Sequence, residues 1–474
     1  MSSNASDNRK SSIGSETGRS GIIPSKYLHQ WVQVANEASA EGYFADQLAY
    51  ERASRGMMRE LAGSMADLRT PFGLTIIDGK HGKQIRKYKP RAEFIKELWA
   101  LVDRRGNIPL SSTQKQLLFE VETAQAGNIS SMSQYLPWSK DGPEKVKAVY
   151  SDKLLKGIDR RRLGEAVEWV SSLVPQNSVV RIRVEEAMFA KDNPYDMVSA
   201  GMDGSTSSGP PWFNQWMVRE EMTRAESERA AVVNQWIIDT AIKYIEVLRR
   251  GEIIPLRAFV GKRIAQKDDL LKRKRIIIAI EKVEPVIWKT VTAVLLPKLG
   301  EIVLPSGVAP FCALRDKPYH DNNAQVMLGN ASRANRIVVS GDYSHYDASI
   351  APELIITAGS IVGGWVRDGG HICSALAESM VNNCSLLTPT KLWKAQPSSM
   401  KSGSGFTNLG DSLVNLIAIK YGELMGLYSV DSVCVQGDDS IVDGPGVTPE
   451  SIQEGVGMLG ISANVEKGMT EKGA

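Results

Sequence analysis

Apolar residues recur at helical spacing along much of the chain, which predicts a protein rich in amphipathic helices. The pattern turns helical from Lys26 onward. The segments whose apolar positions fall on one helical face are residues 90–102, 229–250, 407–424 and 449–459. Arg249-Arg250 and Gly251 predict the end of the second of these helices, and Thr407 is the predicted N-cap of the third.

Shorter runs rich in β-branched residues predict strands between the helices. They are residues 276–280, 336–341, 433–435 and 440–442, with an extended segment at 461–465. The runs at 433–435 and 440–442 stand close enough in the chain to pair as a hairpin.

The turn between those two runs contains Gly437, Asp438 and Asp439. Glycine supplies the positive φ that a tight turn needs, so the segment predicts a β-hairpin. Two carboxylates about 4 Å apart repel each other by about 4 kcal/mol at an effective dielectric constant near 20, and the segment has no lysine or arginine to offset this. A divalent cation with oxygen ligands would relieve the repulsion. The alternative is an ordinary surface turn.

The run at 336–341 leads directly to Asp342, and Asp347 follows five residues later. A carboxylate at the end of a strand is free of the strand's own hydrogen bonding, which suits metal binding. Asp347 lies one turn further on and can reach the same pocket. The alternative is a structural role, in which Asp347 caps the turn that begins at Ala348.

Basic residues concentrate between positions 257 and 282, where nine lysines and arginines stand against three acids. Their central run, residues 272–275, leads straight into the predicted strand at 276–280, so the fold fixes where these charges point. Fixed cations suit a triphosphate; a solvated run is the alternative. The smaller basic clusters at 83–91 and 153–162 are expected to be solvated faces, with contact to RNA phosphates as the alternative.

Composition changes this picture little. The 474 residues are 42% hydrophobic and 23% charged, as in soluble globular proteins, and the length predicts two or three lobes. A net charge of +3 does not establish a nucleic-acid partner.

The four cysteines are scattered, which predicts free thiols in a reducing compartment. We expect no membrane span, and residues 1–24 are expected to form a flexible tail.

Two glycine-rich segments, residues 204–212 and 402–407, complete a series of motifs. The series resembles motifs G, F, A, B, C and D of the viral RNA-directed RNA polymerases over roughly residues 200–470. In chain order it is Thr206–Pro211, Lys267–Ile276, Asp342-x4-Asp347, Ser402-Gly403-x3-Thr407, Gly437-Asp438-Asp439 and Lys467. The sequence TNLGDSLVN that begins at Thr407, together with Gln436, is most similar to the polymerases of double-stranded RNA viruses of the picobirnavirus and partitivirus type.

The resemblance implies an α+β right-hand polymerase fold, with helical fingers and a helical N-terminal region around an antiparallel palm sheet. The expected divisions are the tail at 1–24, the N-terminal region at 25–185, the fingers at 186–335 and the palm at 336–474. Motif E and a thumb normally follow motif D. Because the chain stops at Ala474, the thumb is expected to be missing or truncated.

The resemblance also implies template-dependent RNA synthesis with two Mg²⁺ ions as cofactors. Mn²⁺ is the alternative ion at the same site. The residues that it assigns to metal binding and catalysis are Asp342, Asp438 and Asp439, with Lys467 as a general acid. Those assigned to the NTP are Arg273, Arg275, Asp347, Ser402, Thr407 and Asn408; those assigned to the template are Ser207, Ser208, Gly209, Pro210 and Gly403. The expected partners are RNA and NTPs, with a viral capsid protein considered as well. The expected location is the host cytoplasm or the virion interior.

One position departs from the family pattern. Many of these polymerases have asparagine four residues after the motif B threonine, where this chain has Asp411; Asn408 and Asn415 are nearby candidates for its role. Two other classes of protein stay open as alternatives. They are a reverse transcriptase, which usually has Tyr-x before its aspartate pair, and a non-catalytic RNA-binding protein associated with a capsid.

Overall fold

The computed structural model describes five long stretches of the chain and several short ones. The long stretches are residues 153–189, 224–261, 277–311, 317–387 and 397–463; the short pieces are 74–76, 132–135, 263–266, 314–315, 392–393 and 469–472, with the single residues 113, 149 and 202. The expected tail, the predicted helix at 90–102, the basic cluster at 83–91 and the glycine-rich segment at 204–212 lie outside the described residues.

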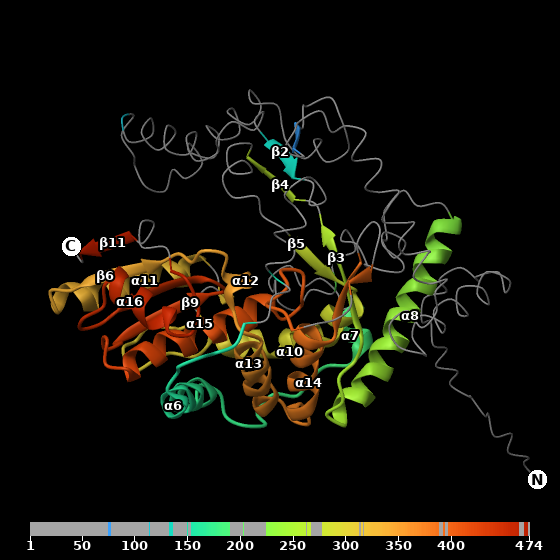
Figure 1. The fold of residues 1–474 in the computed structure, drawn as a ribbon, viewed down its shortest axis with the longest axis horizontal. Helices are drawn as coiled ribbons and strands as arrows, with labels where there is room; N and C mark the ends of the chain where they lie inside the picture. The colour runs from blue at the N-terminus through green and yellow to red at the C-terminus, as the bar shows by residue number, and fades with distance from the viewer. Residues whose placement is uncertain are drawn as a thin grey trace, which may run out of the picture.

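The structure contains an antiparallel sheet of four strands in the order β11-β6-β10-β9, called the palm sheet below after the sheet that the resemblance predicts (Figure 1). Its strands are β6 (Ile337–Gly341), β9 (Ser432–Gln436), β10 (Asp439–Asp443) and β11 (Met469–Lys472). Gln436 pairs with Asp439 across a tight turn in which Gly437 has a φ of 59°. The predicted hairpin and the predicted strand before Asp342 are therefore confirmed.

Among the helices that pack on this sheet are α15 (Thr407–Leu424), which contacts β9, and α16 (Pro449–Gly457), which contacts β6. Every residue of α15 from Leu409 to Ile419 is buried, as expected of a helix enclosed by protein. Both helices were predicted. The N-cap prediction for Thr407 is wrong, because Phe406 holds that position and the Thr407 hydroxyl donates to the backbone oxygen of Lys401 at 2.7 Å.

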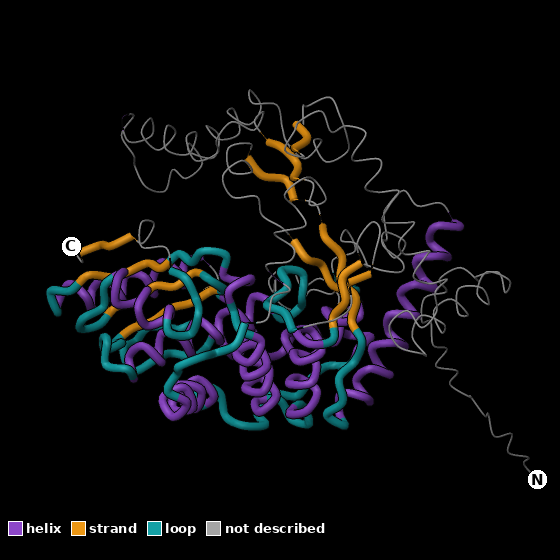
Figure 2. Tube along the Cα trace, viewed as in Figure 1, coloured by secondary structure: helices purple, strands orange, loops and turns teal. Residues whose placement is uncertain are grey.

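A second sheet has the order β5-β3-β7-β8 (Figure 2). Its strands are β3 (Leu256–Gly261), β5 (Ile277–Ile280), β7 (Cys384–Leu387) and β8 (Leu392–Trp393). β3 and β7 run parallel, and the other pairs are antiparallel. An isolated bridge between Ala279 of β5 and Gly403 ties this sheet to the glycine-rich segment before α15.

The other elements pack around the two sheets or beside them. The helices are α6 (Arg160–Ser171), α7 (Val184–Phe189), α8 (Arg224–Arg249), α10 (Val283–Gly300), α11 (Lys317–Arg333), α12 (Tyr346–Ser349), α13 (Pro352–Trp365) and α14 (Gly370–Asn382). A third, antiparallel sheet has the order β1-β2-β4, formed by Leu74–Ile76, Met132–Tyr135 and Arg263–Gln266. One hydrophobic cluster runs through α6, α8, α10, α13–α16 and the two four-stranded sheets.

The basic segments have different roles in the fold. Arg257 lies on β3 and forms a buried ion pair with Glu281 at 3.0 Å, so it is a structural residue rather than a phosphate-binding one. Arg161 and Arg162 pair with Glu165 on the surface of α6, which agrees with a solvated face. Lys153 is half-buried and donates to the hydroxyl of Ser399 at 2.6 Å.

Two further predictions concern thiols and the membrane. The described cysteines, Cys373, Cys384 and Cys434, are buried thiols, as predicted. No helix in the described part of the chain has the length and apolar character of a membrane span.

Candidate active site

The palm sheet brings the two acidic segments of the sequence together. Gly341, the last residue of β6, pairs with Ser440 of β10. Asp342 directly follows β6 and Asp439 directly precedes Ser440, so these two aspartates come next to each other at the same end of the sheet. Asp438 is on the hairpin turn beside them. The sheet register therefore produces one acidic group from residues almost a hundred positions apart in the chain.

The carboxylates of this group interact electrostatically. Partial burial raises the pKa of Asp438, and the negative charges of Asp439, Asp347 and Asp342 raise it further. The pKa of Asp439 is also raised, first by partial burial and then by Asp342. Both shifts mean that the ionised forms are disfavoured in the protein alone, and a cation among them would reverse the effect.

The chemistry of the group fits a hard divalent cation with open coordination positions. Within the described residues, no three His, Cys, Asp or Glu side chains are arranged so that they alone could hold a metal ion. Mg²⁺ is commonly bound by one or two carboxylates, while water and substrate phosphates supply its other ligands. Asp438 and Asp439 are exposed and Asp342 is partly exposed, so substrate phosphates and water can reach all three.

Helix α15 holds the hairpin turn through two polar side chains that the sequence analysis did not assign to this role. The Ser412 hydroxyl accepts from the backbone N–H of Gly437 at 2.7 Å. The Asn415 amide donates to the backbone oxygens of Gly437 at 3.1 Å and Asp438 at 3.4 Å, and its oxygen accepts from the Tyr343 hydroxyl at 2.7 Å. Asn415 is thereby engaged in positioning the turn.

Asp347 lies in the first turn of the short helix α12, beside Asp411 of α15. Asp411 is buried, and its pKa is raised well above the ordinary value, first by burial and then by the charge and hydrogen bond of Asp347. Two carboxyl groups can share a hydrogen bond only when one carries a proton. A protonated Asp411 would be the donor toward Asp347, as an asparagine amide would be.

The structural alternative for Asp347 is not supported. His345 is the N-cap residue of α12 and Ala351 that of α13, and neither helix start has a capping hydrogen bond from the side chain of its N-cap residue. Asp347 is inside α12, not ahead of a helix. Asp347 is therefore the N-cap residue of neither helix.

The glycine-rich segment, residues 402–406, is hereafter the glycine loop. Its Gly403 N–H donates to the backbone oxygen of Ile278 on β5 at 3.0 Å, so the loop lies against the second sheet. Ser402 and, on α15, Asn408 are exposed. Arg273 and Arg275, Lys467, and the template residues Ser207, Ser208, Gly209 and Pro210 lie outside the described residues. Arg275 stands two positions before Ile277, the first residue of β5.

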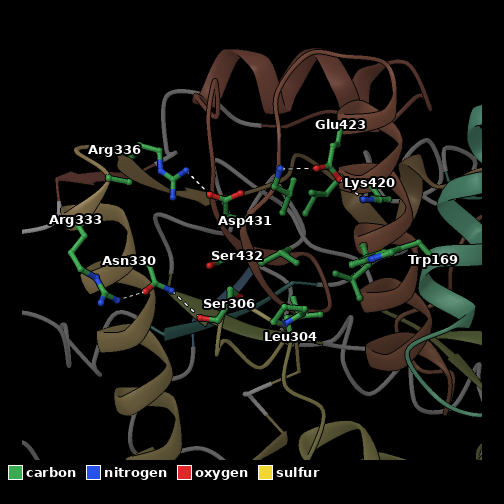
Figure 3. A pocket seen from close by; sticks show the side chains of 16 residues that line it. Trp169, Leu304, Ser306, Asn330, Arg333, Arg336, Lys420, Glu423, Asp431 and Ser432 are labelled. Atoms are coloured by element: carbon green, nitrogen blue, oxygen red, sulfur yellow. Dashed lines mark hydrogen bonds and ion pairs between the residues drawn. The ribbon is translucent and has the colours of Figure 1, made fainter.

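A cavity of about 700 Å³ lies at the base of the hairpin, away from the turn (Figure 3). Arg336 lines it and donates to Asp431 at 2.5 Å and to the buried Asp443 at 3.2 Å. The bonds fasten the base of the hairpin to the segment that leads into β6. The residues that line the cavity include none of the predicted site residues, so the cavity is separate from the acidic group.

The arrangement of acidic residues on adjacent strands fits the class of protein that the motifs resemble, a nucleic-acid polymerase. Residues 324–459 match the family model described as viral RNA-dependent RNA polymerase, and this match includes β6, α15 and the hairpin. This part of the chain is therefore a viral RNA-directed RNA polymerase domain, which transfers nucleotides from NTPs to RNA. The two alternative classes are thereby set aside.

The fold is similar to that of a solved structure, the insertion-loop deletion mutant of the RNA-dependent RNA polymerase of a human picobirnavirus. The TM-score is 0.52 and the sequence identity 17%, over 88% of this chain and 74% of that one. At this identity the similarity is one of fold. It agrees with the predicted mixture of helices and strands. No curated protein matches the chain.

Proposed function

We propose that the polymerase carries out two-metal nucleotidyl transfer at the acidic group, with Asp342 and Asp438 as the principal Mg²⁺ ligands and Asp439 supporting them from beside. The observation that carries this proposal is the pairing of Gly341 with Ser440, which puts the residues after β6 and at the hairpin turn side by side. When bound, the ions would activate the primer 3′-hydroxyl and neutralise charge on the α-phosphate and the leaving pyrophosphate. Ser412 and Asn415 keep the turn in position.

A metal-binding measurement tests this assignment without relying on activity. Mn²⁺ is the probe, and its free concentration is followed by electron paramagnetic resonance. Asp342→Asn is expected to weaken Mn²⁺ binding by about tenfold or more, because a ligand and a negative charge are both lost. Asp431→Asn, which alters an exposed carboxylate at the base of the hairpin, is the matched control. Equal Mn²⁺ affinity in the wild type and Asp342→Asn would overturn the assignment.

Arg273 and Arg275 are proposed to bind the triphosphate of the incoming NTP, and Lys467 to protonate the departing pyrophosphate. The support is their match to the family's basic positions and the nearness of Arg275 in sequence to β5, a strand fixed in the core. Guanidinium groups suit this role because they bind phosphate with two parallel hydrogen bonds.

Replacing Arg273 or Arg275 with glutamine is expected to raise the apparent KM for NTP or lower the incorporation rate by about tenfold, while RNA binding without NTP weakens only modestly. Steady-state kinetics and filter binding of RNA give the two values. Arg161→Gln, on the exposed surface of α6, is the control. If RNA affinity collapses while NTP kinetics stay the same, these arginines are template contacts instead.

The sugar of the NTP is proposed to be read by Asp347 with Ser402, Thr407 and Asn408. Asp411 supports Asp347 from its buried position on α15. The Thr407 hydroxyl donates toward loop oxygens of Lys401 and Ser404, so it stands at the end of the glycine loop next to the motif B residues. Gly403 is proposed to contact the template, together with Ser207, Ser208, Gly209 and Pro210.

The larger organisation is also a proposal. We assign an N-terminal region to residues 25–185, fingers to 186–335 and a palm to 336–474 within a right-hand architecture. The palm assignment is supported by the sheet of β6, β9, β10 and β11. A viral capsid protein is a proposed partner, and the host cytoplasm or the virion interior the proposed location.

A further inference from the structure

A buried glutamate from a different element holds the glycine loop. Glu284 lies in the first turn of α10 and is 0% exposed. Its Oε1 accepts from the Ser404 hydroxyl at 2.5 Å, and its Oε2 accepts from the Gly405 backbone N–H at 3.0 Å. One carboxylate thus satisfies two donors of a loop that follows it by about 120 residues.

Two further contacts and a close backbone approach hold the loop against the same surface. The Gly403 N–H donates to Ile278 of β5, and the ring of Phe406 stacks on Trp288 of α10 with centroids 4.1 Å apart. A Cβ atom at Gly403 would lie 2.6 Å from the Cα atom of Ala279, closer than any side chain could stand. The loop is therefore fitted against β5 and the start of α10.

The residue before the loop is fixed from the other side. The Lys401 amine is buried and donates to the Met380 oxygen at 2.8 Å and the Ser398 hydroxyl at 2.5 Å. Lys401 is also the charged group that acts on Glu284 from the glycine-loop side. The start of the loop is thus held by α14 and by Ser398, and the rest of the loop by the second sheet and α10.

We propose that Glu284 is a positioning residue that keeps the glycine loop in register with β5 and so fixes where Ser402 lies for the proposed reading of the NTP sugar. The inference rests on the proposed role of Ser402, Thr407 and Asn408 in reading the sugar, since these residues stand at the two ends of the loop. Without the carboxylate, the Gly405 N–H and the Ser404 hydroxyl lose their shared acceptor. The loop then keeps only its contacts with Ile278 and Trp288, so its position on β5 is held less firmly.

The pH dependence has a defined sign. Burial raises the pKa of Glu284 to about 7, although hydrogen bonds from Ser404, Gly405 and Trp288 and the charge of Lys401 lower it. The ionised form accepts from both loop donors, so the loop is fully held above pH 7. Protonation removes part of that capacity as the pH falls through about 7.

The test is Glu284→Gln, which keeps the shape of the side chain but turns one acceptor into a donor. The apparent KM for NTP is expected to rise by about tenfold or more with a smaller change in kcat, because a displaced loop misplaces the substrate. The wild type should also show a step near pH 7 in kcat/KM that the variant lacks. The Ser404→Ala variant should raise the KM by part of the amount seen in Glu284→Gln. The double variant should have a KM little higher than that of Glu284→Gln alone.

The matched control is Glu281→Gln, three residues earlier, where a buried glutamate pairs with Arg257 away from the loop. It is expected to lower the melting temperature without raising the KM per folded molecule. An unchanged KM and an unchanged pH step in a folded Glu284→Gln enzyme would overturn the positioning role. That outcome differs from failure of the proposed sugar site, which would appear as an unchanged NTP-to-dNTP ratio of kcat/KM in Asp347→Ala.

Discussion

The Asp438→Asn variant is expected to synthesise RNA about 10³-fold more slowly than the wild type, or slower still, with an unchanged fold. Asparagine keeps the size of the side chain and the turn, but it removes a metal ligand and one negative charge at the reacting centre. Losses of this size are usual when a group that acts in the transition state is removed. Primer extension on a defined RNA template in Mg²⁺, together with thermal melting, measures both quantities.

The melting temperature supplies a second, independent expectation. The pKa of Asp438 is raised in the folded protein, so its ionised form is disfavoured there relative to the unfolded chain. At pH 7 and without divalent ions, Asp438→Asn should therefore melt at the same temperature as the wild type or slightly higher. Asp431→Asn should retain synthesis, because Asp431 pairs with Arg336 at the other end of the hairpin. Near-normal synthesis by Asp438→Asn would refute the two-metal assignment.

The second large effect is expected from Asp347→Ala, which should narrow the preference for NTPs over dNTPs. A site that hydrogen-bonds a hydroxyl rejects the analogue without it, by factors of up to roughly 10⁴, because its own polar groups are left unpaired. Removal of the Asp347 carboxylate should lower the NTP-to-dNTP ratio of kcat/KM by about 10- to 100-fold, mainly through poorer use of NTPs.

Asp411→Asn is the informative companion to that variant. An amide donates to Asp347 in the same way as the protonated carboxyl of Asp411, so the sugar preference should be retained. An unchanged ratio in Asp347→Ala, combined with a lower melting temperature, would leave Asp347 with a purely structural role.

Local sequence patterns predicted the elements that carry the acidic residues. The β-branched run before Asp342, the glycine turn at Gly437 and the helical spacing after Thr407 each act within a few residues, where turn chemistry and periodicity decide the structure. The confirmed strand β6, the hairpin and α15 all follow from such patterns.

The contacts that join these elements could not be predicted in that way. Asn415 reaches the hairpin turn 22 residues later, and Glu284 reaches a loop about 120 residues later. Nothing near either residue in the sequence identifies its partner. The cap prediction for Thr407 was wrong for a local reason, because α15 already begins at this residue and its hydroxyl donates to the backbone oxygen of Lys401, six residues earlier. By sequence, Arg257 belongs to a basic cluster, and only the structure shows that it forms a buried ion pair with Glu281.

The most direct test of the account is templated incorporation by the purified wild-type chain, with labelled NTPs or dNTPs, Mg²⁺ and a defined RNA template. The account predicts a product complementary to the template that forms with NTPs, requires the RNA, and is absent with Asp438→Asn. Incorporation of dNTPs in preference to NTPs, or equal synthesis by Asp438→Asn, would contradict it.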